Sequence, residues 1–343
     1  MRATRVTRKL VGLGLVLAVS VGVLAFVARV GNVPTPTASG TVPATTGTAL
    51  PAVGPELGSY FIQVKYLGQR KTDADGLPMV AYDGVLRYSP SVIAGEAVGY
   101  FSDWVSSGAA ASWAIFLRDC DWLVDHQASN GLWLYQFPYA GQPVPWWSAM
   151  TQGQALSALT RAYQRTGNPR YQIAAARALQ PFTRSQSDDG VALEDVGYTW
   201  YEEYLPPQTP HILNGFMFAL IGIYEYHQTF RDQLSGSIWD TGFGTLKHVL
   251  PSFDTGDWSC YWLGPPTSTP ASSLVSARTS PGSVSSPLGA CRLASVMYQQ
   301  IHVTQLRAIY AWTQNEVIGT YADRFARYLQ SPPAGVPTTT PGP

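Results

Sequence analysis

Three segments of the 343-residue chain are rich in polar side chains and aromatic rings, and two of them also carry carboxylates and tyrosines, which can transfer protons. They cover residues 146–154, residues 200–204 and the stretch from 253 to 302. A carboxylate in such a segment can act as a general base, and a tyrosine hydroxyl can act as a general acid. Aromatic rings in the same place suit a flat, weakly charged ligand such as a sugar. Solvated surface carboxylates and core tyrosines are the alternative interpretation of these residues.

Other common chemistries find no matching pattern in the sequence. The histidines show no metal-ligand spacing with one another or with cysteine; they are His126, His211, His227, His248 and His302. Walker, dinucleotide-binding and G-x-S-x-G motifs are absent. Lysine plus arginine and aspartate plus glutamate both number 22, so the chain lacks the basic excess typical of nucleic-acid binding. We therefore expect no cofactor, no metal and no nucleic-acid partner.

Hydrophobic patterns place the three segments beside helices that follow one another in pairs. Helices are predicted over 90–105, 110–127, 154–165, 171–179, 213–226, 233–250, 303–312 and 317–329. Short strands are predicted over 60–65 and 77–86, joined at Asp75-Gly76, and over 132–137. Paired helices can close into a ring or stack as a solenoid, and the lack of a fixed-period repeat disfavours the solenoid. The predicted fold is mainly α, an (α/α) toroid or incomplete barrel of about four helical hairpins with a small N-terminal β-hairpin.

Residues 1–30 are expected to lie outside the folded body. An apolar run over 10–27 follows four basic residues and precedes one, which predicts a cytoplasmic N-terminus. We interpret the run as an uncleaved membrane anchor, with a cleaved signal peptide as the alternative. The rest of the chain would then be extracytoplasmic, at the cell surface, or secreted. A Pro- and Thr-rich linker over 31–58, a body over 59–330 and a disordered tail over 331–343 are predicted to follow.

Several motifs in the body occur in one characteristic order. They are S-A-M-x-Q-G-Q-A at 148–155, R-A-Y at 161–163, W-Y-E-E-Y at 200–204, L-N-G-F-M at 213–217, L-I-G at 220–222, and then D-T-G at 254–256, Tyr261, Tyr298 and His302. This order resembles the C-terminal domain of the D-glucuronyl C5-epimerases over about residues 146–329. The resemblance implies an (α/α) barrel and an isomerase that converts D-glucuronate to L-iduronate in heparan-type polysaccharides.

The resemblance also assigns residues to roles. Glu203, Tyr204, Tyr261 and Tyr298 fall on its active-site positions. C5 epimerisation needs an acid/base group on each face of the sugar, and no metal or cofactor. Burial is expected to raise the pKa of Glu203 towards neutrality, which makes it the expected base, with Tyr298 or Tyr204 as the acid. Residues expected to contact the substrate are Tyr88, Trp147, Gln152, Gln154, Glu202, Asn214 and His302.

The chain departs from the family pattern after Tyr261. Gly264 stands where the family has an arginine that would help to neutralise a carboxylate, and Arg278 or Arg292 are the candidates to replace it. The family's Tyr-His pair appears here as Tyr298-Gln299.

An insert over 265–290 follows this departure, and Cys260 and Cys291 flank it. We predict that these two cysteines form a disulfide and that Cys120 is free. Two free buried thiols are the alternative for the pair.

The preferred interpretation is a uronyl C5-epimerase that acts on a glucuronate-containing, heparosan-like polysaccharide. It is expected to contact the membrane through its N-terminal segment and is compatible with a homodimer. A polysaccharide lyase that works by β-elimination is the alternative enzyme, and a catalytically degenerate glycan-binding protein is the alternative without catalysis. The sequence does not specify the polymer or its sulfation.

Overall fold

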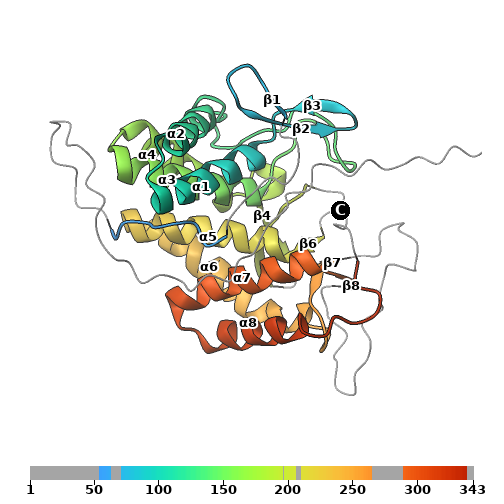
Figure 1. Ribbon diagram of the computed structural model, residues 1–343. Helices are drawn as coiled ribbons and strands as arrows, with labels where there is room; N and C mark the ends of the chain where they lie inside the picture. Colours follow the sequence, from blue (N-terminus) through green and yellow to red (C-terminus); the bar gives the residue numbers. More distant parts are fainter. Residues whose placement is uncertain (1–53, 63–70, 196, 206–209, 265–288, 338–343) are drawn as a thin grey trace, which may run out of the picture.

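The computed structural model describes residues 54–62, 71–195, 197–205, 210–264 and 289–337 (Figure 1). Within these ranges the chain is mainly helical, with small sheets. Eight α-helices follow one another: α1 (Pro90–Ser107), α2 (Ala110–Asp125), α3 (Ala149–Thr166), α4 (Pro169–Leu179), α5 (Leu213–Phe230), α6 (Gln233–Val249), α7 (Val296–Thr313) and α8 (Glu316–Tyr328). The predicted anchor over 1–30 lies outside the described residues. No described helix combines the length and apolar character that crossing a membrane requires.

The helices form pairs because short breakers separate their members. Gly167 ends α3 in the left-handed conformation, and the Asn168 side chain then caps α4 by accepting from the Arg170 N–H. Between α7 and α8, Gln314 ends the first helix in the left-handed conformation, and the Asn315 side chain caps the second. The predicted helices are confirmed with small shifts of their ends. The largest shift is at the start of α3 and α7, whose first turns were predicted as loop.

The first helices of the pairs lie next to one another. α3 packs between α1 and α5, and α5 also packs against α7, while each second helix packs on its own partner. Figure 1 shows α1 to α4 in the upper half of the molecule and α5 to α8 in the lower half. The α3–α5 contact is closest at Gly153 and Gly222, where the two backbones touch: a Cβ on Gly222 would lie 2.0 Å from the Gly153 carbonyl oxygen.

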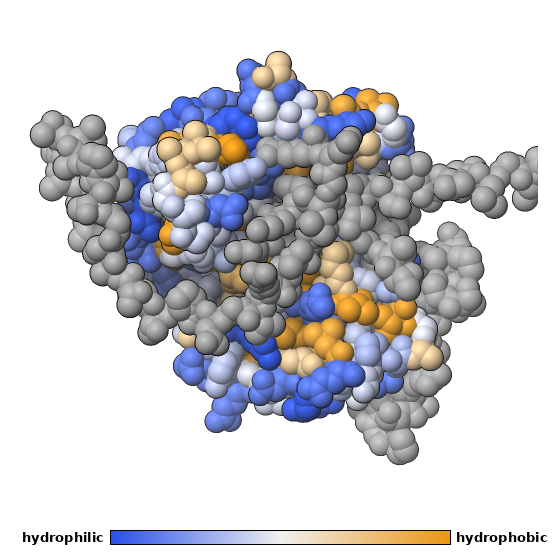
Figure 2. All heavy atoms as spheres, viewed as in Figure 1, coloured by the Kyte–Doolittle hydropathy of each residue, from blue (hydrophilic) through white to orange (hydrophobic). Residues whose placement is uncertain are grey.

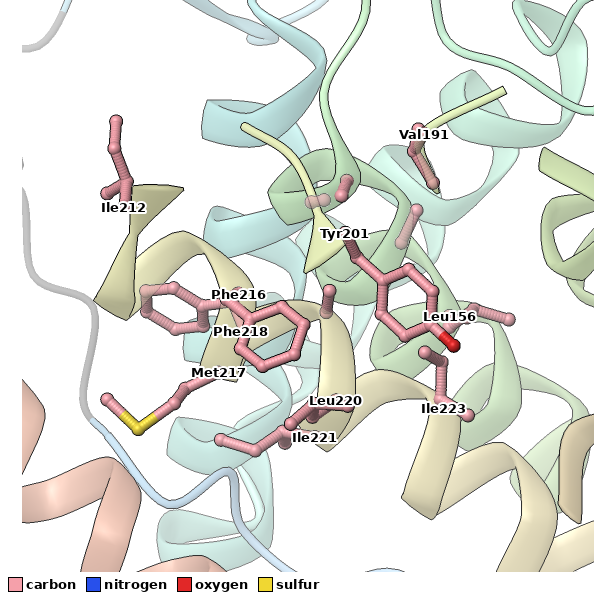
Figure 3. Packing of buried hydrophobic residues seen from close by; sticks show 14 of the residues in the cluster. Leu156, Val191, Tyr201, Ile212, Phe216, Met217, Phe218, Leu220, Ile221 and Ile223 are labelled. Atoms are coloured by element: carbon pink, nitrogen blue, oxygen red, sulfur yellow. The ribbon is translucent and has the colours of Figure 1, made fainter. Parts of the chain in front are cut away.

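Helix α5 forms the centre of the hydrophobic core. Its sequence is apolar nearly all round, which predicts burial on all sides, and almost every residue in it is buried. Figure 3 shows Phe216, Phe218, Leu220 and Ile223 packed among side chains from α3 and from the strand that ends at Tyr201. The N-terminal turn of this helix is therefore held in place by the core that surrounds it.

Three small antiparallel sheets lie toward one side of the helical body (Figure 1). β1 (Lys71–Thr72), β2 (Pro78–Tyr82) and β3 (Val85–Arg87) form one. β4 (Ala192–Asp195) pairs with β5 (Tyr198–Tyr201), and the third sheet has the order β6 (His211–Ile212), β7 (Cys260–Gly264), β8 (Ala290–Leu293).

The strand predictions were only partly correct. The turn at Asp75-Gly76 joins β1 to β2, so the partner strand is Lys71–Thr72 and not 60–65, of which residues 60–62 are described and form no strand. The predicted strand over 77–86 is two strands, because Asp83 and Gly84 both adopt positive φ and reverse the chain. The predicted strand over 132–137 is reduced to a single bridge between Tyr135 and Trp146, since this region has no longer partner strand.

Residues 54–62 cross the body and contact α3 and α5. The Gly54 N–H donates to the Thr229 carbonyl at the end of α5, and the Gln164 amide of α3 contacts Leu57 and Pro55. Part of the predicted linker is thus bound to the helices. Figure 2 shows polar and hydrophobic residues mixed over the visible face, with a hydrophobic area in its lower half, in the region where Figure 1 draws α7.

Candidate active site

Glu203 lies in the loop that follows β5 and is almost completely buried, with 6% of its surface exposed. Its Oε2 atom has no hydrogen-bond partner among the described residues. The carboxyl group packs against Gly215 in the first turn of α5, where a Cβ would lie 2.2 Å from Oε2. The glycine of the L-N-G-F-M motif is therefore required by the close approach of this carboxyl group.

Burial raises the pKa of Glu203 to about 8, and the neighbouring Glu202 charge acts in the same direction. The Tyr204 hydroxyl opposes the shift by stabilising the carboxylate. Sequence analysis predicted a shift in this direction. A carboxyl group with a pKa near 8 exchanges protons readily at neutral pH, as a general acid or base must.

Three tyrosines surround Glu203. Tyr204 follows it in the chain, Tyr261 comes from β7, and Tyr298 comes from the first turn of α7. The rings of Tyr261 and Tyr298 lie 4.4 Å apart, centre to centre. Burial raises the pKa of each tyrosine well above its usual value, and the charge of Glu203 raises it further. The structure thus brings the four predicted catalytic residues into one cluster.

The N-terminal turns of α3, α5 and α7 converge on this cluster. The Ala149 N–H at the start of α3 donates to the Glu202 carbonyl oxygen at 2.9 Å. The first turn of α5 contacts Glu203 through Gly215. The first turn of α7 carries Tyr298, and the Gln305 amide in the middle of α7 donates to the Asn214 carbonyl oxygen of α5 at 2.9 Å. Because helix N-termini carry partial positive charge, this arrangement favours negative charge at the centre.

The position of Tyr298 is determined by a helix cap. The Ser295 side chain accepts from the Tyr298 N–H and so starts α7 at Val296. The other tyrosine of the close pair, Tyr261, lies at a register shift in β7, between Cys260 and Trp262. Such a bulge turns a side chain out of the regular alternation of a strand. A cap and a bulge thus position the pair.

A second buried carboxylate, Glu202, is paired with a histidine. The Glu202 side chain contacts His211 Nδ1 at 2.5 Å, and His211 Nε2 lies 2.9 Å from Asp195. Trp200 stacks on the imidazole, with ring centres 4.1 Å apart. Burial lowers the pKa of His211, but the two carboxylates outweigh it, so the net direction is upward and the ring favours the cationic form.

His211 was not among the predicted site residues, because it shows no metal-ligand spacing and lies outside the motifs that pointed to the site. The part of the chain that the structure describes has no group of three or more histidine, cysteine, aspartate or glutamate side chains suited to hold a metal ion. The signal that could have found His211 is its position directly before α5, the helix that carries the L-N-G-F-M motif.

Some of the predicted substrate-contacting residues are engaged elsewhere. The Gln152 amide is fully buried and bonds to Gly131 and Ala178, so the structure uses it to join backbone segments. The Tyr88 hydroxyl is exposed and donates to Asp73 at 2.7 Å. These contacts do not bring Gln152 or Tyr88 to the Glu203 cluster.

Trp147 and His302 are likewise held by internal partners. The Trp147 indole N–H donates to the Gly190 carbonyl oxygen at 2.7 Å. His302 lies one turn after Tyr298 in α7, and its Nδ1 is 2.9 Å from the Ser259 hydroxyl. Burial lowers the pKa of His302 to about 3, so its ring is neutral.

Three of the predicted substrate-contacting residues keep a buried polar atom without a hydrogen-bond partner in the described region, and one of these atoms is His302 Nε2. Gln154 Oε1 in α3 and Asn214 Oδ1 in α5 are buried and make no hydrogen bond there. Both belong to the helix ends that converge on Glu203. Buried polar atoms of this kind are rare in folded proteins and are often satisfied by water or a ligand.

An aromatic wall beside the cluster combines Trp146, from the candidate segment 146–154, with Tyr139, which the sequence did not point to. Trp146 stacks near Tyr204, with ring centres 5.9 Å apart, and Tyr139 stacks near Trp146 at 5.8 Å. The charge of Glu203 also acts on Tyr139, whose pKa is raised mainly by burial. The density of aromatic residues between α2 and α3 was the signal available in the sequence.

Residues 126–278 match the sequence family described as D-glucuronyl C5-epimerase C-terminus. The D-glucuronyl C5-epimerase of Caenorhabditis elegans is 33% identical over 233 residues, which are 62% of this chain and 34% of the nematode protein. This region belongs to the D-glucuronyl C5-epimerase C-terminal family. An uncharacterized protein of Methanocaldococcus jannaschii is 29% identical over 136 residues, or 38% of this chain and 44% of the archaeal protein. The matches thus span less than half of each relative.

The family region contains Glu203, Tyr204 and Tyr261, whereas Tyr298 lies after its end at residue 278. The disulfide predicted at the end of this region is present: Cys260 and Cys291 are bonded, with Cα atoms 5.5 Å apart. Cys120 is a free, buried thiol, as predicted. β8 is therefore covalently joined to the strand that carries Tyr261.

Proposed function

We propose that the protein is a uronyl C5-epimerase that converts D-glucuronate to L-iduronate in a glucuronate-containing polysaccharide of the heparosan type. The observation that carries the proposal is the buried Glu203 carboxyl group, with its pKa near 8, against the tyrosine pair Tyr261 and Tyr298. A carboxyl group and two tyrosine hydroxyl groups lie together there. Among the described residues, Glu203 has no oppositely charged partner. The family membership of residues 126–278 supports the same reaction.

Ionised Glu203 would remove the proton from C5, and the electron pair would move into the adjacent carboxylate to give an enolate-like intermediate. The three converging helix N-termini favour the extra negative charge. Tyr298 would then return a proton to C5 from the opposite face, and the tyrosinate would be reprotonated from solvent or through Tyr261. Glu203 and Tyr298 are close enough for the charge of Glu203 to raise the pKa of Tyr298.

The arrangement of helices fits this role. We propose that α1, α3, α5 and α7 are the inner helices of an incomplete (α/α) toroid, since each packs on the next. The polysaccharide would cross the N-terminal ends of α3, α5 and α7. The same proposal places the folded body outside the cytoplasm, attached through residues 1–30, and the Cys260–Cys291 disulfide fits an oxidising compartment.

Proton exchange in deuterated water tests the proposal on a panel of glucuronate polymers. We expect deuterium at C5, and iduronate as product, without chain cleavage. An unsaturated product that absorbs in the ultraviolet would contradict the proposal and indicate a lyase. Binding of the polymers without exchange or cleavage would contradict it as well and indicate a glycan-binding protein.

A further inference from the structure

Arg292 on β8 lies beside the tyrosine pair. It is paired with Trp262 of β7, and the register shift between Cys260 and Trp262 leaves Tyr261 as the extra residue opposite it. In such a bulge two residues of one strand face one residue of the other. The position of Arg292 therefore follows from the register of the β7–β8 pair.

The disulfide determines this register covalently. Cys291 directly precedes Arg292, and its partner Cys260 directly precedes Tyr261. The bond closes a loop of 31 residues in sequence, most of it outside the described residues. Strands joined by such a long insert have no short turn to set their pairing, so the disulfide supplies the constraint.

Arg292 interacts electrostatically with Tyr261 and is half-buried. Burial lowers its pKa from the usual value, because the guanidinium has lost part of its hydration. Tyr261 in turn feels the charges of Tyr298 and Glu203. A partly dehydrated arginine next to an acid/base cluster is well suited to bind a carboxylate, which matches its planar fork of donors.

The reaction proposed above requires such a cation. The substrate carries a carboxylate next to C5, and its enolate form carries one further negative charge. At the position of the family arginine, Gly264 has no charge, and a Cβ there would lie 3.2 Å from the Pro210 Cα. Pro210, the residue directly before β6, occupies that side of the strand. Arg278, the other candidate, lies outside the described residues.

We propose that Arg292 binds the uronate carboxylate and that the Cys260–Cys291 disulfide holds it beside Tyr261 for this purpose. The inference rests on the proposed epimerase function for its substrate. It assigns the role of the missing family arginine to a different strand, β8, which lies after the family region ends.

The test compares binding of a glucuronate polymer with binding of the same polymer after its carboxyl groups are reduced to alcohols. We expect the wild type to prefer the uronate form and Arg292→Gln to lose that preference by roughly 10- to 100-fold, the range for a hydrogen-bonded charge pair. Arg292→Lys should retain part of it, since the charge remains and the fork is lost. Arg170→Gln is the matched control, because Arg170 pairs with Asp121 and Asp125 on the surface.

Reduction of the disulfide tests the second half of the proposal. A thiol reductant should lower the preference of the wild type towards that of Arg292→Gln. It should have no further effect on Cys260→Ser/Cys291→Ser. Circular dichroism should show that the reduced protein and the variants remain folded. Unchanged preference after reduction would overturn the positioning role of the disulfide.

The outcomes separate the two proposals. If the wild type exchanges C5 protons and Arg292→Gln keeps the full preference for the uronate form, the inference about Arg292 is wrong and the epimerase function stands. If the wild type catalyses no exchange but Arg292→Gln loses the preference, the epimerase function is wrong and the carboxylate site stands.

Discussion

At the residue scale, Glu203 has to be ionised to act as a base, while its surroundings favour the neutral acid. Because burial raises its pKa to about 8, the fraction of ionised Glu203 increases as the pH rises through that value. We predict that kcat/KM for C5 exchange rises with pH and levels off above about pH 8. Glu203→Gln should lose about 10²- to 10⁴-fold in exchange rate, the usual contribution of a general base.

Glu194→Gln is the control for this experiment. It makes the same change of charge as Glu203→Gln, but Glu194 lies exposed on β4 and outside the Glu203 cluster. A Glu203→Gln protein that exchanges within about threefold of the wild type would exclude Glu203 as the base, because that is far below the effect of losing a general base.

The same carboxyl group affects stability. Its pKa is about 8 in the folded state and near 4.5 when unperturbed, so the unfolded chain ionises first as the pH rises. The folded state therefore loses stability between about pH 4.5 and pH 8 on account of this residue. We predict that Glu203→Gln is more stable than the wild type at pH 7, by up to about 3 kcal/mol, and has similar stability at pH 4. Denaturant unfolding at both pH values measures this, and equal differences at the two would contradict the raised pKa.

Tyr298 is the residue expected to act on the opposite face of the sugar. Tyr298→Phe removes only the hydroxyl, so the ring contact with Tyr261 and the substrate affinity should survive. We predict that inversion falls by two to four orders of magnitude. Exchange at C5 should persist, because Glu203 can still remove and return a proton on its own face. Measuring deuterium incorporation and iduronate content on the same sample separates the two, and normal inversion would transfer the role to Tyr204 or Tyr261.

At the scale of elements, the contact between α3 and α5 depends on two glycines. A Cβ on Gly222 would lie 2.0 Å from the Gly153 carbonyl oxygen, and neither backbone can move without disturbing the core. We predict that Gly222→Ala destabilises the protein by about 1–3 kcal/mol or more through overpacking. Gly244→Ala in α6 is the matched control, since no atom lies within 4 Å of its Cβ position, and it should be neutral or slightly stabilising.

The elements also show what the sequence could predict. Helices were predictable because their periodicity and their breakers are local: Gly167 and Asn168 separate α3 from α4 by their own backbone preferences. The small sheets were not, because their partners are distant: β6 pairs with β7 across about fifty residues. Strands this short carry too few residues to show alternation.

The site was predictable for a different reason. The family motifs assign Glu203 and the three tyrosines to positions, and the structure brings them together. Residues outside the motifs were missed when their position near the site depends on tertiary contacts: His211 contacts Glu202, and Tyr139 lies near the cluster in a loop before α3. Gln152 is the opposite case: it belongs to a motif, but its side chain has a structural role, because it bonds to the backbone of Gly131 and Ala178.

At the scale of the whole molecule, Arg161 of the R-A-Y motif joins segments that are distant in the sequence. It makes a bidentate ion pair with Glu225 of α5, at 2.6 and 2.7 Å, and donates to the Gly58 carbonyl oxygen. The guanidinium also lies over the rings of Tyr60 and Phe101, 5.3 and 5.6 Å from their centres. This motif residue thus serves the fold and not the cluster at Glu203.

The pair is buried, and this determines what its removal should do. Arg161→Met leaves Glu225 charged in the core without its partner, so we predict a loss of about 3–5 kcal/mol in the free energy of unfolding. Arg161→Met/Glu225→Met should recover much of that loss, because replacing both charges with apolar side chains of similar size avoids the unpaired charge. Exchange activity per folded molecule should stay unchanged in both, since neither residue belongs to the cluster. Urea unfolding measures the free energy of unfolding of the single and the double variant. A double variant as unstable as the single one would mean that the contacts of Arg161 with Gly58, Tyr60 and Phe101 stabilise the molecule more than its pairing with Glu225.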